Sequence, residues 1–298
     1  MRAIPSEPLR RGEAIVRKHG RGLPVDTIVG ALRVATELRA TPTELSDIPM
    51  GASRLGGQPD LPPGFVWPRW EGFKATKKDQ SGNRPSPLSF VAQISLAEFP
   101  DASGLLPETG WLVFFYDVEQ QPWGFDPRDR GAGRVMWFKG SADSLVRTEG
   151  PKGSLECLPT LAVPALTPTL PRWEDALGLL LEGPASAQYT KLSVEVVAGP
   201  EPHHRVFGWP KLLQNPMELQ CQLVSNGFYL GDDSAVGDPK VKELEAGASD
   251  WLLLLQLDTD EDGPGWMWGD AGCIYFWIRR QDLAERNFDA VWVILQCN

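Results

Sequence analysis

The sequence repeats one short pattern, and this repeat limits the folds that the chain can adopt. In the first copy a glutamine inside an apolar run, Gln93, is followed 17 residues later by Gly110 and a second apolar run. In the second copy the corresponding residues, Gln256 and Gly272, lie 16 residues apart. Apolar runs of this kind, separated by a loop, are typical of neighbouring β-strands. The repeat therefore predicts an internally duplicated β-sheet unit.

A Gly-x-Pro sequence stands before each copy and supports duplication over coincidence. The first is Gly57-Gln58-Pro59 and the second is Gly208-Trp209-Pro210. Glycine and proline together are typical of a tight turn. We expect a turn at the same place in each unit.

The order of patterns along the chain predicts four segments. These are an N-terminal arm and helix (1–49), a first β-rich repeat (50–140), a connector rich in Pro and Leu (141–190) and a second β-rich repeat (191–298). We expect them to pack as one compact domain. The predicted fold class is α+β, predominantly β, with a few peripheral helices.

The spacing of apolar residues predicts the individual elements. Residues 1–24 show no sustained periodicity and are expected to form an irregular arm. From Val25 to Leu38 apolar residues recur every three or four positions, which predicts a helix. The other expected elements are strands at Leu88–Leu96, Trp111–Val118, Arg134–Phe138, Lys191–Val197 and Ala290–Leu295, and short helices at Trp173–Leu181 and Asp282–Arg286.

Length and composition indicate a soluble globular protein. The chain has 298 residues, of which 42% are hydrophobic, enough for a core without disulfide bonds. The four cysteines are widely spaced and form no C-x-x-C pair, which indicates reduced thiols rather than a zinc site. The N-terminus lacks the apolar run of a signal peptide, and no later run approaches about 18 apolar residues. We expect a cytoplasmic protein with no membrane partner.

The charge balance excludes one class of partner. The net charge is −10, and a field of this sign repels the phosphate backbone of a nucleic acid. Ten carboxylates fall between residues 232 and 262, against two lysines. This acidic segment is a solvated face, a cation site or a surface for a basic partner.

The motifs of the two units occur in a fixed order that can be compared with known families. The first unit contains Ser53-Arg54-Leu55-Gly56-Gly57-Gln-Pro59, Phe90-Val-Ala-Gln93-Ile94 and Gly110-x-Leu112-x-Phe114-Phe115. The second contains His203-x-Arg205-x-Phe207-Gly208-Trp-Pro210, Leu255-Gln256-Leu257-Asp258 and Trp268-Gly269-Asp270-Ala-Gly272-x-Ile274. Over roughly residues 50–298 this order resembles the YwqG-like family of unknown function. The resemblance implies a β-rich α+β fold with internal duplication, and it implies no reaction, cofactor or catalytic set.

Gln93 and Gln256 are candidate ligand-binding residues. Each lies inside an apolar strand, where a buried amide needs partners for its donors and its acceptor. In one interpretation each glutamine ties its strand to the backbone of a neighbouring loop, such as the Gly-x-Pro turn. In the other, the two amides face a ligand near a pseudo-symmetry axis.

His203 is the candidate catalytic residue. It stands next to His204, and neighbours on a strand point to opposite faces, so at most one of them joins a given site. One interpretation is a structural imidazole bonded to backbone, and the other is a general base or metal ligand. No nucleophile motif accompanies the pair, so nucleophilic hydrolysis has little support.

The stretch from Asp258 to Gly263 begins like a calcium-binding loop. Alternate carboxylates at Asp258, Asp260 and Asp262 would converge on one cation, with Asp270 in place of the missing glutamate at the twelfth position. These four aspartates are the candidate metal ligands, and Ca²⁺ is the only candidate cofactor. The alternative is an ordinary acidic turn between strands.

Three of the twelve tryptophans, Trp209, Trp266 and Trp268, are also candidate ligand-binding residues. Each lies beside Pro or Gly, and such loop tryptophans stack on sugars or on proline-rich peptides. Alternatively they seal the ends of β-sheets.

The absence of an assembled catalytic set favours a non-catalytic binding module for a protein or peptide partner. Two other functions are compatible with the sequence. One is a metal-assisted hydrolase in which His203 and the aspartates hold a cation that activates water. The other is a carbohydrate-binding module built on exposed tryptophans. The oligomeric state is not determined by the sequence.

Overall fold

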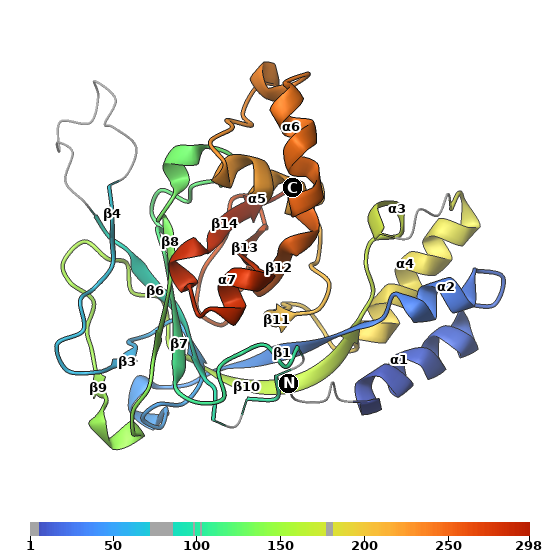
Figure 1. Ribbon diagram of the computed structural model, residues 1–298. Helices are drawn as coiled ribbons and strands as arrows, with labels where there is room; N and C mark the ends of the chain where they lie inside the picture. Colours follow the sequence, from blue (N-terminus) through green and yellow to red (C-terminus); the bar gives the residue numbers. More distant parts are fainter. Residues whose placement is uncertain (1–5, 72–85, 98, 102, 177–180) are drawn as a thin grey trace.

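A ten-stranded antiparallel sheet is the main element of the fold (Figure 1). The computed structural model describes residues 6–71, 86–97, 99–101, 103–176 and 181–298. Across the sheet the strands are β14 (Trp292–Gln296), β13 (Cys273–Arg279), β12 (Trp251–Asp258), β11 (Arg205–Phe207), β1 (Arg33–Pro42), β10 (Thr160–Thr169), β2 (Arg54–Leu55), β6 (Ser89–Ser95), β7 (Trp111–Tyr116) and β8 (Gly133–Phe138).

Smaller elements connect and cover the sheet. Two short ladders pair β3 (Asp60–Leu61) with β9 (Val146–Arg147) and β4 (Arg69–Trp70) with β5 (Ser86–Pro87). The α-helices are α1 (Ser6–His19), α2 (Val25–Gly30), α3 (Trp173–Ala176), α4 (Pro184–Val197), α5 (Glu218–Ser225), α6 (Pro239–Leu244) and α7 (Arg280–Ala284). The 3-10 helices are η1 (Leu45–Asp47), η2 (Pro127–Asp129), η3 (Ala142–Ser144), η4 (Asp233–Ala235), η5 (Glu245–Asp250) and η6 (Phe288–Ala290).

The sheet curves until its two ends face each other and enclose the main core. Phe114 on β7 contacts Phe276 on β13, with ring centroids 5.3 Å apart. Gly133 on β8 lies so close to β14 that an added Cβ would stand 2.2 Å from Val293. Apolar side chains of β6, β7, β12, β13 and β14 therefore form one continuous cluster. Burial of this cluster is the main favourable contribution to folding.

The helices α1, α2 and α4 pack together beside the central strands β1 and β10 (Figure 1). Their buried side chains, including Val16, Ile28 and Leu192, form a separate apolar cluster. Gly12 of α1 lies against β10, where an added Cβ would be 2.9 Å from Pro168. In the described part of the chain, no helix is long and apolar enough to cross a membrane.

Strands β1 and β10 join the two halves of the sheet through ten paired positions, from Arg33 opposite Thr169 to Pro42 opposite Thr160. Strand β10 contains Pro164 and Pro168, which lack an N–H group. The N–H of Ala162 points to the β2 side, where it bonds Ser53. Because successive N–H groups alternate in direction, both prolines also turn their nitrogen to that side, and β2 pairs only with Thr160 and Leu161. The prolines therefore cost no ladder bond to β1.

Several predicted elements are confirmed. The strands expected at Leu88–Leu96, Trp111–Val118 and Arg134–Phe138 correspond to β6, β7 and β8. The last strand and the turn of helix before it correspond to β14 and α7, each shifted by one or two residues. The helix expected from Trp173 begins there as α3, and residues 177–180 lie outside the described part. Strong apolar runs with turns on both sides made these elements predictable.

The helix predicted from Val25 to Leu38 is wrong beyond Gly30. The chain forms α2 only to Gly30 and then β1 from Arg33. Val34, Ala35 and Leu38 are all buried, because both faces of β1 are covered over this stretch. Burial on both faces places apolar residues at consecutive positions, and this removes the alternation that marks a strand.

The strand predicted at Lys191–Val197 is also wrong, because these residues end the helix α4. Leu192 and Val196 are buried and Val194 is 64% exposed. Positions four apart share a face in a helix as well as in a strand, so a short alternating run did not distinguish the two. The burial of Tyr189, one turn before Leu192, continues the helical spacing.

Two segments expected to be irregular contain regular structure. Residues 6–19 form α1, whose buried positions are four apart. Two of them, Pro8 and Gly12, are not large apolar residues, so the helical spacing was hidden in the sequence. Residues 160–169 of the predicted connector form β10, which the prolines concealed. In both segments the element is stabilised by contacts with distant parts of the chain.

Asp129 is a buried carboxylate with one unsatisfied oxygen. It lies at the end of η2, where its Oδ2 accepts a hydrogen bond from the Gly124 N–H (2.8 Å). Its Oδ1 has no hydrogen-bond partner among the described residues. Burial raises the pKa of Asp129 to about 6, although the N–H groups of Gly124 and Asp126 oppose this shift.

We predict that Asp129 makes the protein less stable as the pH rises. The folded state holds this proton more tightly than the unfolded chain, so the favourable contribution is complete below about pH 4 and is lost as the pH rises through about 6. Between these pH values, the free energy of unfolding of Asp129→Asn should fall less than that of the original chain. The difference between the two should be up to about 3 kcal/mol. Urea unfolding across this range measures it. The exposed Asp143→Asn serves as control, and equal pH profiles for both variants would contradict the prediction.

Candidate functional site

Gln93 and Gln256 bind equivalent backbone groups in the two halves of the sheet. The Oε1 of Gln93 accepts from the N–H of Asp60 (2.8 Å), and its Nε2 donates to the carbonyl of Ala52 (3.0 Å). The Oε1 of Gln256 accepts from the N–H of Lys211 (2.8 Å), and its Nε2 donates to the carbonyl of His203 (2.8 Å). Asp60 and Lys211 each follow a Gly-x-Pro turn. Both glutamines are fully buried, and these bonds favour the interpretation that they tie a strand to a turn.

An arginine stands opposite each glutamine and holds the same turn. Arg54 pairs with Gln93 across the sheet, and Arg205 pairs with Gln256. Arg54 donates to the carbonyl of Gln58 (2.9 Å), and Arg205 donates to the carbonyl of Trp209 (3.4 Å). In each case the acceptor is the middle residue of Gly-x-Pro. The turn is therefore held from two sides.

The glycine of each turn has a conformation that other residues rarely adopt. Gly57 has φ +67° and Gly208 has φ +72°. A Cβ on Gly57 would stand 2.8 Å from Pro159, and one on Gly208 would stand 2.6 Å from Ala35. Each glycine lets its turn approach the neighbouring central segment, which sets the position of the residue that follows.

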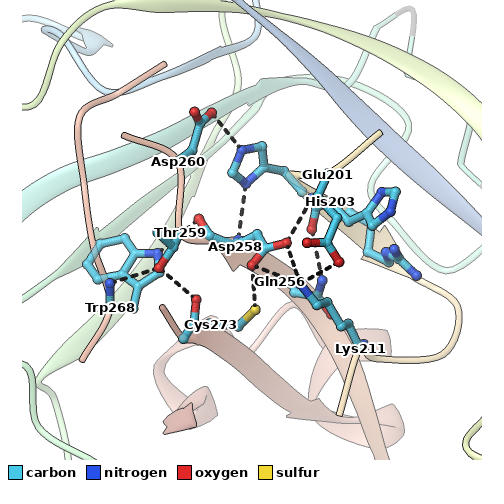
Figure 2. Close-up of polar contacts among 12 residues, drawn as sticks. Glu201, His203, Lys211, Gln256, Asp258, Thr259, Asp260, Trp268 and Cys273 are labelled. Carbon is cyan, nitrogen blue, oxygen red and sulfur yellow. Dashed lines mark hydrogen bonds and ion pairs between the residues drawn. The ribbon is translucent and has the colours of Figure 1, made fainter. Parts of the chain in front are cut away.

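Asp258, at the end of β12, is the centre of a polar network (Figure 2). Its Oδ2 accepts from the backbone N–H of His203 (3.0 Å) and from the Lys211 ammonium (3.1 Å). Its Oδ1 accepts from the Cys273 thiol (3.0 Å). Burial favours the neutral acid, but these donors lower the pKa of Asp258 below its ordinary value. The carboxylate is ionised at neutral pH, and its oxygens are occupied.

Cys273 and Lys211 are the two side chains of this network that could act as nucleophiles, and both have raised pKa values. Burial, and then the charge of Asp258, raises the pKa of Cys273 well above its ordinary value. A thiol with a raised pKa is not a nucleophile at neutral pH. Burial lowers the pKa of Lys211, but Glu201 and Asp258 outweigh it and the net shift is upward, so the amine stays protonated. Neither side chain has the ionisation state that covalent catalysis requires.

The adjacent histidines contact different carboxylates. His204 is fully buried, and its Nδ1 lies 3.2 Å from the backbone N–H of Asp258. Because that N–H only donates, Nδ1 is the acceptor and Nε2 carries the proton that is donated to Asp260 (3.1 Å). The side chain of His203 is 14% exposed, and its Nδ1 lies 2.9 Å from Oε1 of Glu37. His203 is therefore the histidine nearer the surface.

The four candidate metal ligands are not brought together. Asp258 is occupied as described, and Asp260 accepts from His204 and from the N–H of Gly263 (2.8 Å). Burial opposes ionisation of Asp260, but these two donors lower its pKa. Asp262 and Asp270 are exposed. Within the described ranges, no group of three or more His, Cys, Asp or Glu side chains is arranged to hold a metal ion.

Trp266 and Trp268 lie in the core. They are 3% and 0% exposed, and both indole N–H groups donate to the carbonyl of Asp258 (2.8 and 3.2 Å). Trp268 also packs against Tyr116 of β7, with ring centroids 5.8 Å apart. This arrangement favours the interpretation that the pair seals the end of the sheet.

Trp209 differs from these two because it lines a cleft. Its indole N–H donates to the carbonyl of Ala31 (2.7 Å), and its backbone N–H donates to Thr169 Oγ1 (3.0 Å). The Arg33 guanidinium lies over its ring, 3.4 Å from the centroid. Contacts to its indole nitrogen, its backbone and the face of its ring therefore hold Trp209 in place.

This cleft, which we call the Trp209 cleft, has a volume of about 670 Å³. Its walls come from the second Gly-x-Pro turn, the beginning of β1, the segment after β10, η5, β12 and β13. The side chains that characterise it are Trp209, Trp251, Trp277, Arg33, Arg172 and Arg280. Of these, sequence reasoning identified only Trp209. The others come from elements far apart in the chain, and Arg33 lay in a segment predicted to be a helix.

The chain is an α+β protein with a curved antiparallel sheet and a cleft lined in part by tryptophans. The model of the family described as a domain of unknown function, DUF1963, matches residues 53–297. The chain belongs to this family, in agreement with the resemblance of its motifs to the YwqG-like family. No curated protein matches the sequence.

We predict that replacing either buried glutamine strongly destabilises the fold. Gln93→Leu or Gln256→Leu keeps the side-chain volume but leaves a buried N–H and a buried carbonyl without partners. Each unsatisfied group costs about 1–3 kcal/mol, so urea unfolding should show a loss of about 2–4 kcal/mol. The exposed Gln281→Leu should change the free energy of unfolding by less than about 0.5 kcal/mol. Losses below about 1 kcal/mol at Gln93 and Gln256 would show that the amide bonds are dispensable.

Proposed function

We propose that this chain is a non-catalytic binding protein that takes a peptide segment of a protein partner in the Trp209 cleft. The observation that carries this proposal is the lining of the cleft. Tryptophan and arginine are among the residue types that dominate binding energy at protein interfaces, and they supply six of its side chains. A volume of about 670 Å³ is within the usual range of ligand sites.

Pre-organisation of the wall supports the proposal. Trp209 is held through its indole and its backbone, and Arg33 is stacked on it. On the other wall, the indole of Trp251 donates to Gln222 (3.0 Å), and Arg279 lies 4.9 Å from its ring centroid. Side chains fixed before binding lose little conformational entropy when a ligand arrives. The cleft is therefore suited to recognition.

The polar network around Asp258 gives less support to a metal-assisted hydrolase. Such an enzyme needs an open cation site beside a general base. In this network, Asp258 and Asp260 already accept hydrogen bonds from protein donors, and His203 faces Glu37. Its charges are compensated within the fold, as in a structural network.

A carbohydrate-binding module also has less support. Stacking on a sugar requires an aromatic face that solvent can reach. Trp266 and Trp268 are buried in the core, so Trp209 is the only one of the three candidate tryptophans that lines the cleft. Trp209 is half-buried and Arg33 covers one face of its ring, so this face is not open for stacking on a sugar.

We also infer that the two halves of the sheet derive from one duplicated unit. Support comes from the matching bonds of Gln93 and Gln256, and of Arg54 and Arg205, to their turns. The copies differ at the middle of the turn, where Gln58 in one corresponds to Trp209 in the other. Only the second turn lines the cleft. Binding would then be a property acquired by one copy.

A peptide-display selection tests the binding proposal. Short random peptides are selected on the folded protein, and their dissociation constants are measured by fluorescence anisotropy. Ser249 is exposed at the cleft wall, so Ser249→Trp fills the cleft with little effect on the core. We expect this change to weaken binding about tenfold or more, because the added indole occupies the volume that the peptide needs.

The matched control is Ser234→Trp, at an exposed site away from the cleft. It should bind as the original chain does, and both variants should melt at the original temperature. An empty selection, or peptides that bind Ser249→Trp equally well, would overturn the proposal.

A further inference from the structure

We infer that the Trp209 cleft recognises an acidic segment, with a carboxylate of the partner seated between Arg33 and Arg280. This inference rests on the proposed function and specifies the chemistry of the partner. Three observations support it: the positive charge of the cleft lining, the contacts that its arginines make, and the indole N–H of Trp277, which has no partner among the described residues.

The charge of the cleft is opposite to that of the whole chain. The chain has a net charge of −10, but the charged residues that line the cleft are three arginines and one carboxylate, Glu218. The positive local potential attracts an anion at short range, while the overall charge repels a long polyanion such as a nucleic acid.

Arg33 is oriented for an acceptor that the described chain does not supply. Its guanidinium carbon lies over the Trp209 ring, 3.4 Å from the centroid, and a guanidinium stacked in this way can still donate its N–H groups to a planar carboxylate. No carboxylate or carbonyl of the described residues accepts a hydrogen bond from it, and none forms an ion pair with it.

Arg280 is the second positive charge at this position. Desolvation lowers the pKa of Arg33, Glu218 raises it and Arg280 lowers it. The two guanidinium groups therefore repel each other, and Glu218 already offsets this repulsion at Arg33. A second anion between the arginines would form charge-assisted hydrogen bonds, which are stronger than neutral ones.

Arg172 contributes at the rim in a different way. It donates to the carbonyl of Gln214 (2.7 Å) and lies 3.6 Å from Glu174. Its charge is thus partly compensated by the fold. For this reason we assign the carboxylate to Arg33 and Arg280.

The inner wall of the cleft is aromatic and contains an unpaired donor. Trp277 is 1% exposed, and its indole N–H has no hydrogen-bond partner in the described ranges. A buried donor without an acceptor costs free energy, and a carbonyl or carboxylate oxygen of a bound segment would recover it. The partly buried side chains of Leu32, Leu212 and Leu252 add an apolar surface to the cleft. The partner segment should therefore carry a large apolar residue next to its acidic residue.

The test uses an array of short synthetic peptides with identical Leu, Phe or Trp flanks. The central residues are Asp or Glu in one set, Asn or Gln in the second and Lys or Arg in the third. Binding is compared between the original chain and the double variant Arg33→Gln/Arg280→Gln. We expect the acidic set to bind most tightly and to lose about tenfold or more in the double variant, because truncation leaves the carboxylate unpaired.

The matched control is Arg21→Gln/Arg39→Gln, which removes the same charge from two exposed sites outside the cleft. It should retain binding within about twofold, since distant surface charges contribute little. Melting temperatures of both double variants confirm that they are folded.

The outcomes separate the two proposals. If amide or basic peptides bind as tightly as acidic ones and Ser249→Trp blocks them, the inference fails and the proposed function stands. If acidic peptides bind but the Arg33 and Arg280 changes have no larger effect than the control, the carboxylate does not bind between these two arginines and the inference fails. If no peptide in any set binds, both proposals fail.

Discussion

The ten-position ladder between β1 and β10 is the interaction on which the rest of the structure depends. All strands on one side of the sheet are attached through β1, and all strands on the other side are attached through β10. The helix α1 packs on both of these strands, and α4 packs on β10 and on α1. Because the ladder holds both halves, it also allows the sheet ends to meet around one core. Without it the main apolar cluster would be divided between two separate half-sheets.

The glutamine bonds transmit this arrangement to the cleft. Each buried amide fixes a Gly-x-Pro turn against a strand, and the paired arginine holds the turn from the other side. In the second half, the turn presents Trp209 to the cleft and brings Gly208 against β1. The same device in the first half presents Gln58 instead. A structural feature common to both halves thus positions a wall of the cleft in only one.

Buried polar groups in this protein serve two different purposes. Around Asp258 the donors and acceptors satisfy one another, and ionised groups are held in the states that stabilise the fold. In the Trp209 cleft, the buried indole N–H of Trp277 has no hydrogen-bond partner among the described residues, and the exposed guanidinium of Arg33 lies over the ring of Trp209. A satisfied network specifies structure, whereas unsatisfied donors beside a cleft are available to a ligand. This contrast is one reason for our proposal that the cleft, rather than the network, binds a partner.

The sequence by itself determined the local features: strands β6, β7 and β8, the Gly-x-Pro turns, and the burial of Gln93 and Gln256. These depend on neighbours in the chain, so apolar runs and turn residues reveal them. Tertiary contacts decided the helical state of residues 184–197, the strand state of Arg33–Pro42 and the place of β10. These contacts cover both faces of β1, and they turn the nitrogens of the β10 prolines away from β1. The cleft was decided in the same way. Its arginines and tryptophans come from segments far apart in the chain, and the order of β13, β12, β11 and β1 in the sheet brings these segments together.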